Sequence, residues 1–271
     1  MKKQVVLKII FVAVIIGVTA TIFSINLQEE TIEIENVSIS TIPRAVIIDQ
    51  LHNDKPNLEY QKNVTAYLTS AGYDVDIFTT DDITVDFYKK LPSMNYEFIV
   101  IRSHSLGDGT VEESASLFTG ELYRKDRYMN EQFAGQVGKG LPYLPAEVER
   151  LGGWEALRDE TYFVIGSKLV DELMVGTFPN SIIVLGGCET TETTNLADSL
   201  LQRGASEIIG WNGLVSSKDN DKVIMNLLED TLVNDVEIQH AVQSVMQEYD
   251  EKLLPPATLK YYSSGASDSK G

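Results

Sequence analysis

The stretch that decides the fold is IIVLGGC, residues 182–188. Four consecutive aliphatic residues that end at two glycines are typical of a strand buried on both faces. The runs RAVIID at 44–49 and FIVIRSHS at 98–105 have the same form, and apolar residues at helical spacing lie between them, over 58–71. This alternation predicts an α/β domain with a mostly parallel central sheet and helices on both faces.

The rest of the chain extends the pattern on both sides. Further strands are expected at 75–78, 161–165 and 206–210, and further helices at 168–174, 196–201 and 238–249. Residues 106–160 are rich in glycine and charge and are expected to form an insertion with short elements. The domain is therefore placed at 44–252, and residues 253–271 are expected to be a flexible tail.

The N-terminal residues predict a membrane anchor. Met1-Lys2-Lys3 precedes an apolar run from Ile9 to Ile25, which at about 17 residues is near the lower limit for a spanning helix. Positive charge before the run favours an internal N-terminus and export of the rest. We expect an uncleaved signal anchor at 1–26 followed by a stalk at 27–43, with a cleaved signal peptide and secretion as the alternative. The domain is expected outside the cytoplasm in both cases.

Composition excludes some classes of partner. The net charge is −18, whereas a phosphate-binding surface needs clustered Lys and Arg, so nucleic acid is not expected as a partner. No oxygen-rich loop of the calcium-binding type is found, and neither a metal nor a cofactor is expected. The chain has one cysteine, so an intramolecular disulfide is impossible.

Strand ends select the candidate site without reference to any family. In parallel sheets ligands gather at the carboxyl ends of the strands, where this sequence places Asp49, His104, Cys188 and Trp211. An imidazole beside a thiol can take its proton and make it a nucleophile. Gly187 would let a substrate backbone approach closely, and backbone N–H groups at Cys188 and near Ser105 are candidate oxyanion donors. The competing interpretation is a satisfied histidine beside an inert buried thiol.

The two apolar blocks, ending in RSHS at 102–105 and GGCET at 186–190, resemble the dyad motifs of clan CD cysteine peptidases. This group includes caspases, legumain, clostripain and the gingipains, with the related CHAT domains. The resemblance spans roughly residues 44–248 and implies a three-layer caspase-like sandwich. It implies Cys188 as the nucleophile and His104 as the general base and later acid. Where this sequence has Ser105 the family usually has Gly.

The resemblance also assigns roles around the pair. Asp49 would face the pocket for the residue before the scissile bond and favour Arg or Lys there, and Trp211 would form a wall of the cleft. The competing interpretations are a helix-cap or turn residue for Asp49 and a core or rim aromatic for Trp211. The function predicted is an extracytoplasmic cysteine endopeptidase that acts on peptide or protein substrates without a cofactor. The alternative is a catalytically weak or inactive domain that binds or senses at the surface. The Cβ of Ser105 favours this alternative, because it would crowd the oxyanion hole. A flavodoxin- or receiver-like ligand module is a third hypothesis, but no phosphate-cradling glycine loop follows the first strand.

Overall fold

The computed structural model describes residues 42–106, 115–249, 253 and 256–265, all of which belong to the unit that spans 42–271. Its centre is a six-stranded sheet with the order β10-β9-β8-β3-β1-β2. The strands are parallel except β10, which runs antiparallel to β9. Their bounds are β1 Arg44–Asp49, β2 Asp74–Thr79, β3 Phe98–Arg102, β8 Ile182–Gly186, β9 Glu207–Asn212 and β10 Thr258–Ser263. The predicted α/β class with a mostly parallel sheet is confirmed.

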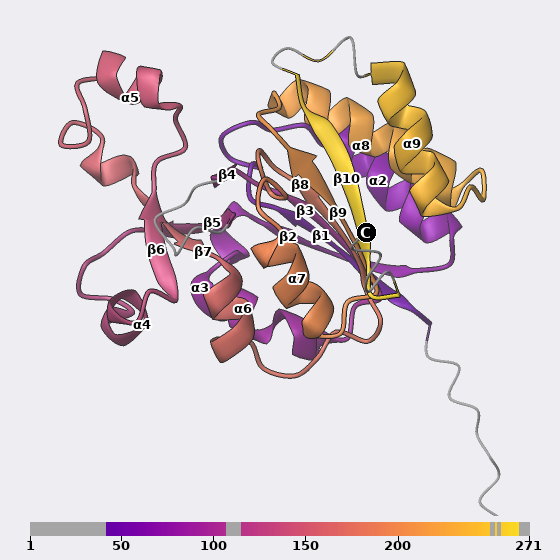
Figure 1. Ribbon diagram of the computed structural model, residues 1–271, viewed down its shortest axis with the longest axis horizontal. Coiled ribbons are helices and arrows are strands. Elements are labelled where there is room, and N and C mark those ends of the chain that lie inside the picture. Colours follow the sequence, from indigo (N-terminus) through magenta and orange to yellow (C-terminus); the bar gives the residue numbers. More distant parts are fainter. Residues whose placement is uncertain (1–41, 107–114, 250–252, 254–255, 266–271) are drawn as a thin grey trace, which may run out of the picture. The chain divides into compact units, whose positions relative to one another are not determined.

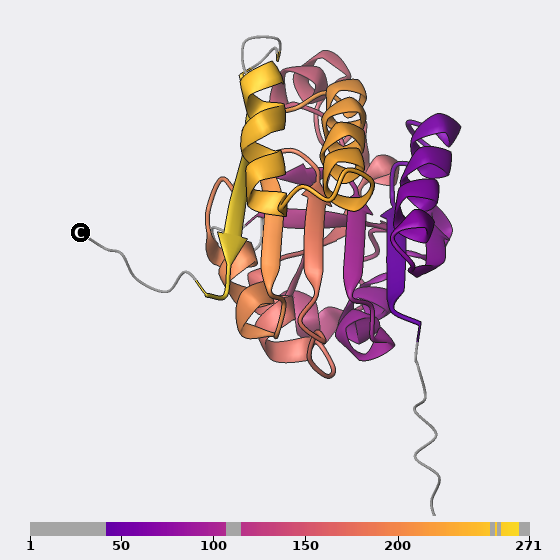
Figure 2. The same ribbon diagram turned by 90° about the vertical axis from the view of Figure 1, so that its right-hand side faces the viewer.

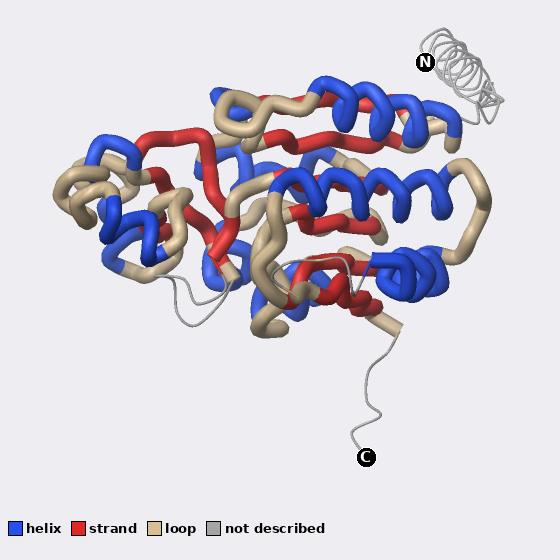
Figure 3. Tube along the Cα trace, turned by 90° about the horizontal axis from the view of Figure 1, so that it is seen from above, coloured by secondary structure: helices blue, strands red, loops and turns tan. Residues whose placement is uncertain are grey.

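Helices cover both faces of this sheet (Figure 1). One face carries α2 (Leu58–Ser70), α8 (Ser217–Leu232) and α9 (Ile238–Tyr249), which lie side by side across it in Figure 2. The other face carries α3 (Val85–Lys90), α6 (Ser167–Leu173) and α7 (Asn195–Gln202). Figure 3, seen from above, shows the α2, α8 and α9 layer stacked on the strands.

Alternation along the strands explains why two separate cores form. In β1, Ala45 and Ile47 pack in the cluster under α2, α8 and α9, whereas Val46 and Ile48 pack in the cluster under α3, α6 and α7. Successive side chains of a strand point to opposite faces, so a wholly apolar strand needs a helical layer on each side. The continuous apolar runs seen in the sequence are therefore the cause of the layered arrangement.

The predicted insertion forms a second sheet beside the carboxyl ends of the main strands (Figure 1). It is antiparallel, with the order β4-β5-β7-β6, and the backbone N–H of Phe118 in β5 donates to the His104 carbonyl oxygen at 3.1 Å. The strand expected at 161–165 belongs to this sheet and not to the main one, because its neighbours come from the insertion. The element bounds are β4 Ser105–Leu106, β5 Ser116–Leu122, β6 Val137–Gly140, β7 Tyr162–Ile165, α4 Met129–Phe133 and α5 Pro145–Arg150, with 3₁₀ turns at Thr80–Asp82, Leu91–Met94 and Arg158–Glu160.

The expected flexible tail is corrected in its described part. Residues 258–263 form β10 along the whole of β9, with Thr258 opposite Asn212 and Ser263 opposite Glu207. Leu259 is buried and packs with the α8 and α9 core. The alternation of apolar and polar residues in this short strand was too brief to be recognised beside its Ser- and Gly-rich continuation. The domain therefore extends at least to Ser263.

The predicted signal anchor at 1–26 and all but the last two residues of the predicted stalk lie outside the described residues. Within the described ranges, no helix combines the length and the apolar character that crossing a bilayer requires.

Gly120 provides a test of how the second sheet is attached to the main domain. Its N–H donates to the Ile83 carbonyl oxygen at 2.6 Å, and a Cβ at this position would lie 1.7 Å from the Thr80 carbonyl oxygen. Backbone cannot yield as a flexible side chain can, so Gly120→Ala is expected to lower the free energy of unfolding by about 3 kcal/mol. Chemical denaturation of the full chain measures this. Gly265→Ala, at a glycine with open space around it, is the matched control and should change stability by less than about 0.5 kcal/mol.

Candidate active site

The segments that carry His104 and Cys188 lie next to each other at the carboxyl edge of the main sheet. Arg102 in β3 is the register partner of Gly186 in β8, and the Ser103 N–H donates to the Gly186 carbonyl oxygen at 3.1 Å. Two residues further along, the Ser105 hydroxyl donates to the Cys188 carbonyl oxygen. The structure thus brings together four of the predicted site positions, namely His104, Ser105, Gly187 and Cys188.

The His104 imidazole contacts a carboxylate that the sequence analysis missed. Its Nε2 lies 2.9 Å from Oδ2 of Asp54, which is in the loop after β1, and the ring packs edge-on against Phe118 with centroids 5.8 Å apart. Its side chain is 24% exposed. The backbone N–H of His104 donates to Oε1 of the buried Gln50 side chain at 3.0 Å. The sequence signal for Asp54 was weak, since it is one polar residue in a turn-forming run after a strand.

Burial lowers the pKa of His104 below the ordinary imidazole value, and the Asp54 carboxylate opposes this only in part. The lowered pKa leaves the ring neutral at neutral pH. A neutral imidazole can accept a proton at one ring nitrogen, and a carboxylate that is hydrogen-bonded to the other nitrogen fixes the orientation of the ring. His104 therefore has the electrostatic state that a general base needs.

The role of Asp54 is testable by replacing it with Asn. Because the Asp54 carboxylate raises the His104 pKa against the effect of burial, Asp54→Asn is expected to lower that pKa further. The chain has three histidines, so each imidazole can be followed by NMR as a function of pH. Asp81→Asn, at an exposed carboxylate that faces Asn53 instead, is the control and should leave the titration of His104 unchanged. A higher His104 pKa in the Asp54 variant would contradict the assignment.

The Cys188 thiol is half-buried and interacts with backbone. It donates to the Val215 carbonyl oxygen at 3.2 Å, and the Val215 N–H lies 3.5 Å from the sulfur. Burial raises the pKa of the thiol, the Val215 backbone lowers it, and the charge of Glu189 raises it. Val215 directly precedes Ser216, the N-cap of α8, whose hydroxyl accepts from the Asp219 N–H. In this conformation the thiol is protonated at neutral pH.

Among the described residues, no hydrogen bond joins the His104 imidazole to the Cys188 thiol. The imidazole is held by Asp54 and the thiol by Val215. The two groups thus lie on neighbouring segments of one edge, each with its own polar partner. Attack on a substrate would require the thiol to leave the Val215 carbonyl.

The expected role of Asp49 is corrected by the structure. Its side chain is buried, and Oδ1 accepts from Nη1 of Arg102 at 2.8 Å. The same guanidinium binds Asp221 through Nε and Nη2 at 2.7 and 2.8 Å, and Nη2 also donates to the Lys55 carbonyl oxygen at 2.8 Å. Because Asp49 already neutralises a buried cation, it does not face a pocket for a substrate side chain.

The expected role of Trp211 as a cleft wall is also corrected. The indole is fully buried in the core beneath α8 and α9, and its Nε1 donates to Oδ1 of Asn220 at 2.9 Å. A side chain without solvent exposure cannot line an open cleft. Trp211 is the penultimate residue of β9 (Glu207–Asn212), near the site edge, but its side chain points to the face covered by α2, α8 and α9.

Comparison with protein-family models and with curated proteins finds no match to this chain.

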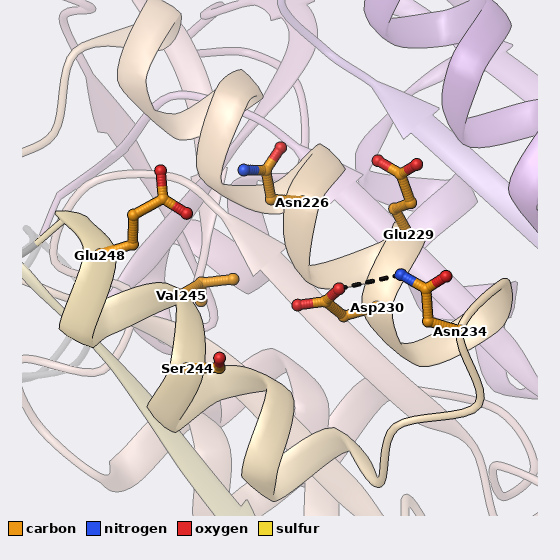
Figure 4. Close-up of a pocket in the computed structure, with 7 residues that line it drawn as sticks. All are labelled: Asn226, Glu229, Asp230, Asn234, Ser244, Val245 and Glu248. Carbon is orange, nitrogen blue, oxygen red and sulfur yellow. Dashed lines mark hydrogen bonds between the residues drawn. The ribbon is translucent and has the colours of Figure 1, made fainter.

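A pocket lies away from the strand edge, between α8 and α9 (Figure 4). Its volume is about 220 Å³, and it contains none of the predicted site residues. Within it the Asn234 amide donates to Asp230 at 3.1 Å. Across the described ranges, no three His, Cys, Asp or Glu residues are grouped so that they could hold a metal ion. The cavity is lined by Asn226, Glu229, Asp230, Asn234, Ser244, Val245 and Glu248.

Proposed function

We propose that this protein is a cysteine endopeptidase of the caspase and gingipain type, with Cys188 as nucleophile and His104 as general base. The observation that carries the proposal is the placement of both residues just after neighbouring parallel strands, β3 and β8, at the ligand-binding edge of the sheet. The neutral, carboxylate-oriented state of His104 supports it further. The helical layers on both faces of the sheet agree with the three-layer sandwich that the family resemblance implies.

The proposed reaction uses only groups of this site. His104 takes the thiol proton as the sulfur of Cys188 attacks the scissile carbonyl carbon, and a C–S bond forms. The protonated imidazole then gives that proton to the leaving amine as the C–N bond breaks, which leaves a thioester. Water, activated by His104, hydrolyses the thioester and releases the carboxylate product and the free thiol. Backbone N–H groups near Cys188 and Ser105 would stabilise the oxyanion of each tetrahedral intermediate.

A glycine at position 187 is a requirement of this arrangement. A Cβ there would lie 2.5 Å from the Ser103 carbonyl oxygen and 2.7 Å from the Ser105 hydroxyl. The close approach of the two segments depends on the missing side chain. The resulting contact keeps the residues on either side of His104 against the residue that precedes Cys188.

A second candidate function is a binding or sensing domain that has lost the reaction. Two observations favour it: the thiol is hydrogen-bonded to the Val215 carbonyl oxygen, and burial raises its pKa. Such a thiol is a poor nucleophile until substrate binding or a local movement releases it. The two functions differ in whether Cys188 reacts with peptide carbonyls.

The cellular setting of the proposal comes from the sequence. A signal anchor at 1–26 would attach the protein to a membrane with the domain outside the cytoplasm, where exposed peptide segments of proteins would be its substrates. The net charge of −18 argues against nucleic acid as a partner. The preference for Arg or Lys before the scissile bond is not retained, because the ion pair with Arg102 occupies Asp49.

Hydrolysis of a mixed fluorogenic peptide library by the full chain tests the proposal. The wild-type protein is expected to cleave a subset of peptides, and Cys188→Ala is expected to reduce cleavage to background. Circular dichroism of both proteins establishes that they are folded. Folded wild-type protein that cleaves no peptide above the Cys188→Ala background would favour the binding domain instead.

A further inference from the structure

We propose that Ser105 is a positioning residue that clamps the backbone of Cys188 and so fixes the direction of its Cα–Cβ bond relative to His104. The inference rests on the proposed peptidase function, because it concerns the same site. The Ser105 hydroxyl does not touch the reacting atoms, and it acts through Cys188. Its hydroxyl links the segment that follows β3 directly to the segment that follows β8.

The clamp is a part-buried contact. Ser105 is 7% exposed, and its hydroxyl donates to the carbonyl oxygen of Cys188. Gly187 makes room for it, since a Cβ at Gly187 would lie 2.7 Å from the Ser105 hydroxyl oxygen and 3.3 Å from its Cβ. The serine side chain thus fills the space that a side chain at 187 would otherwise take.

A second hydrogen bond fixes the opposite side of the same peptide unit. The Cys188 carbonyl and the Glu189 N–H belong to one planar peptide group, and the Glu189 N–H donates to the Gly213 carbonyl oxygen at 3.0 Å. The group is therefore held by Ser105 from the β3 side and by Gly213 from the β9 side. A peptide plane restrained at both ends sets the ψ angle of Cys188 and thereby the direction of its Cα–Cβ bond.

The backbone at Glu189 shows why such restraint is needed. Its φ of 55° lies in the left-handed region, which a residue with a Cβ occupies at an energetic cost. Conformations of this kind persist only where surrounding contacts over-determine them. Without the Ser105 hydroxyl, the peptide unit would be held from one side only and could relax, which would move the thiol.

The clamp makes a prediction opposite to that of steric crowding. If the Ser105 Cβ obstructed the oxyanion donors, Ser105→Gly would raise turnover and Ser105→Ala would leave it unchanged. If the hydroxyl positions Cys188, both substitutions lower turnover. We expect kcat to fall by about 10- to 100-fold in both variants with little change in KM, as for small displacements of a reacting group.

Alkylation by iodoacetamide is a test of the clamp that does not depend on peptidase activity. Cys188 is the one cysteine of the chain, so the reaction rate reports on this thiol alone. Loss of the clamp should free the thiol from Val215 and speed alkylation about fivefold, the factor that one intramolecular hydrogen bond contributes. Amide hydrogen exchange at residues 188–190 should also become faster in Ser105→Ala, at temperatures well below unfolding.

Ser181→Ala is the matched control. Ser181 is also a buried serine, and its hydroxyl donates to the Tyr96 carbonyl oxygen at 2.6 Å, so it joins the β3 and β8 segments at the opposite end of these strands. It is expected to change melting temperature as much as Ser105→Ala while leaving kcat and the alkylation rate at their wild-type values.

The outcomes separate the clamp from the proposed function. Alkylation and exchange that are faster in Ser105→Ala than in the wild type would support the clamp. If the wild-type protein at the same time cleaves no peptide, the peptidase is contradicted and the clamp still stands. Turnover that rises in Ser105→Gly would overturn the clamp and leave the peptidase standing. Equal alkylation and exchange rates in wild type, Ser105→Ala and Ser105→Gly would also overturn the clamp.

Discussion

Replacing Arg102 by Met is expected to lower the free energy of unfolding by about 3–5 kcal/mol. Arg102 is 1% exposed and bridges Asp49, Asp221 and the Lys55 carbonyl oxygen. Its removal leaves two buried carboxylates without a compensating charge, and this cost exceeds that of losing the hydrogen bonds alone. The bridge also joins the loop that carries Asp54 to β3 and α8.

Urea denaturation of the full chain measures the effect. Arg124→Met is the matched control, because Arg124 is an exposed residue whose pairing with Asp126 should contribute little to stability. Equal stabilities of the Arg102 and Arg124 variants would contradict the account of the buried network.

Replacing His104 by Ala is expected to lower kcat/KM for peptide hydrolysis by about 10²- to 10⁴-fold, the usual contribution of a general acid–base residue. His240→Ala is the control, since His240 is an exposed residue on α9 whose backbone N–H and ring contact Glu237. It should retain wild-type activity. Comparable losses in both variants would indicate that the effect is not specific to the proposed base.

The pH profile of peptide hydrolysis by the wild-type protein provides a further check on His104. Burial lowers the pKa of the imidazole, so the acid limb of kcat/KM should lie below the ordinary histidine value. The buried thiol, whose pKa is raised, does not create an acid limb, because the proposed attack starts from the protonated thiol and His104 takes its proton. An acid limb above the ordinary histidine value would assign the titration to another group.

Most of the main sheet was predictable because its strands are buried on both faces. Runs such as 98–101 and 182–185 have too few polar residues to lie anywhere but between two helical layers. The second sheet was not predictable, since its strands lie in a segment rich in Gly and charged residues. One of its apolar clusters contains only two buried residues, Phe118 and Val164, which gives a weak hydrophobic pattern. The strand at 161–165 was recognised as a strand but was assigned to the wrong sheet.

The site was predictable as positions along strands and not as contacts between side chains. His104 and Cys188 follow apolar runs, so their placement at one edge followed from parallel pairing. The same rule selected Asp49 and Trp211, but both side chains are buried. A position near the end of a strand does not decide which face of the sheet a side chain points to, because side chains alternate between the two faces. Asp54 was missed because loop contacts depend on a conformation that sequence spacing does not specify.

Covalent labelling of Cys188 by a peptide-based acyloxymethyl ketone, followed by intact-protein mass spectrometry, tests the central claim most directly. Such reagents react with a thiol that a neighbouring base activates after the peptide has bound in the cleft. The account predicts one label per chain, attached to Cys188, at a rate that saturates with reagent concentration and falls at least about 100-fold in His104→Ala. Labelling that stays at the rate of a free cysteine, with no saturation and no dependence on His104, would contradict it.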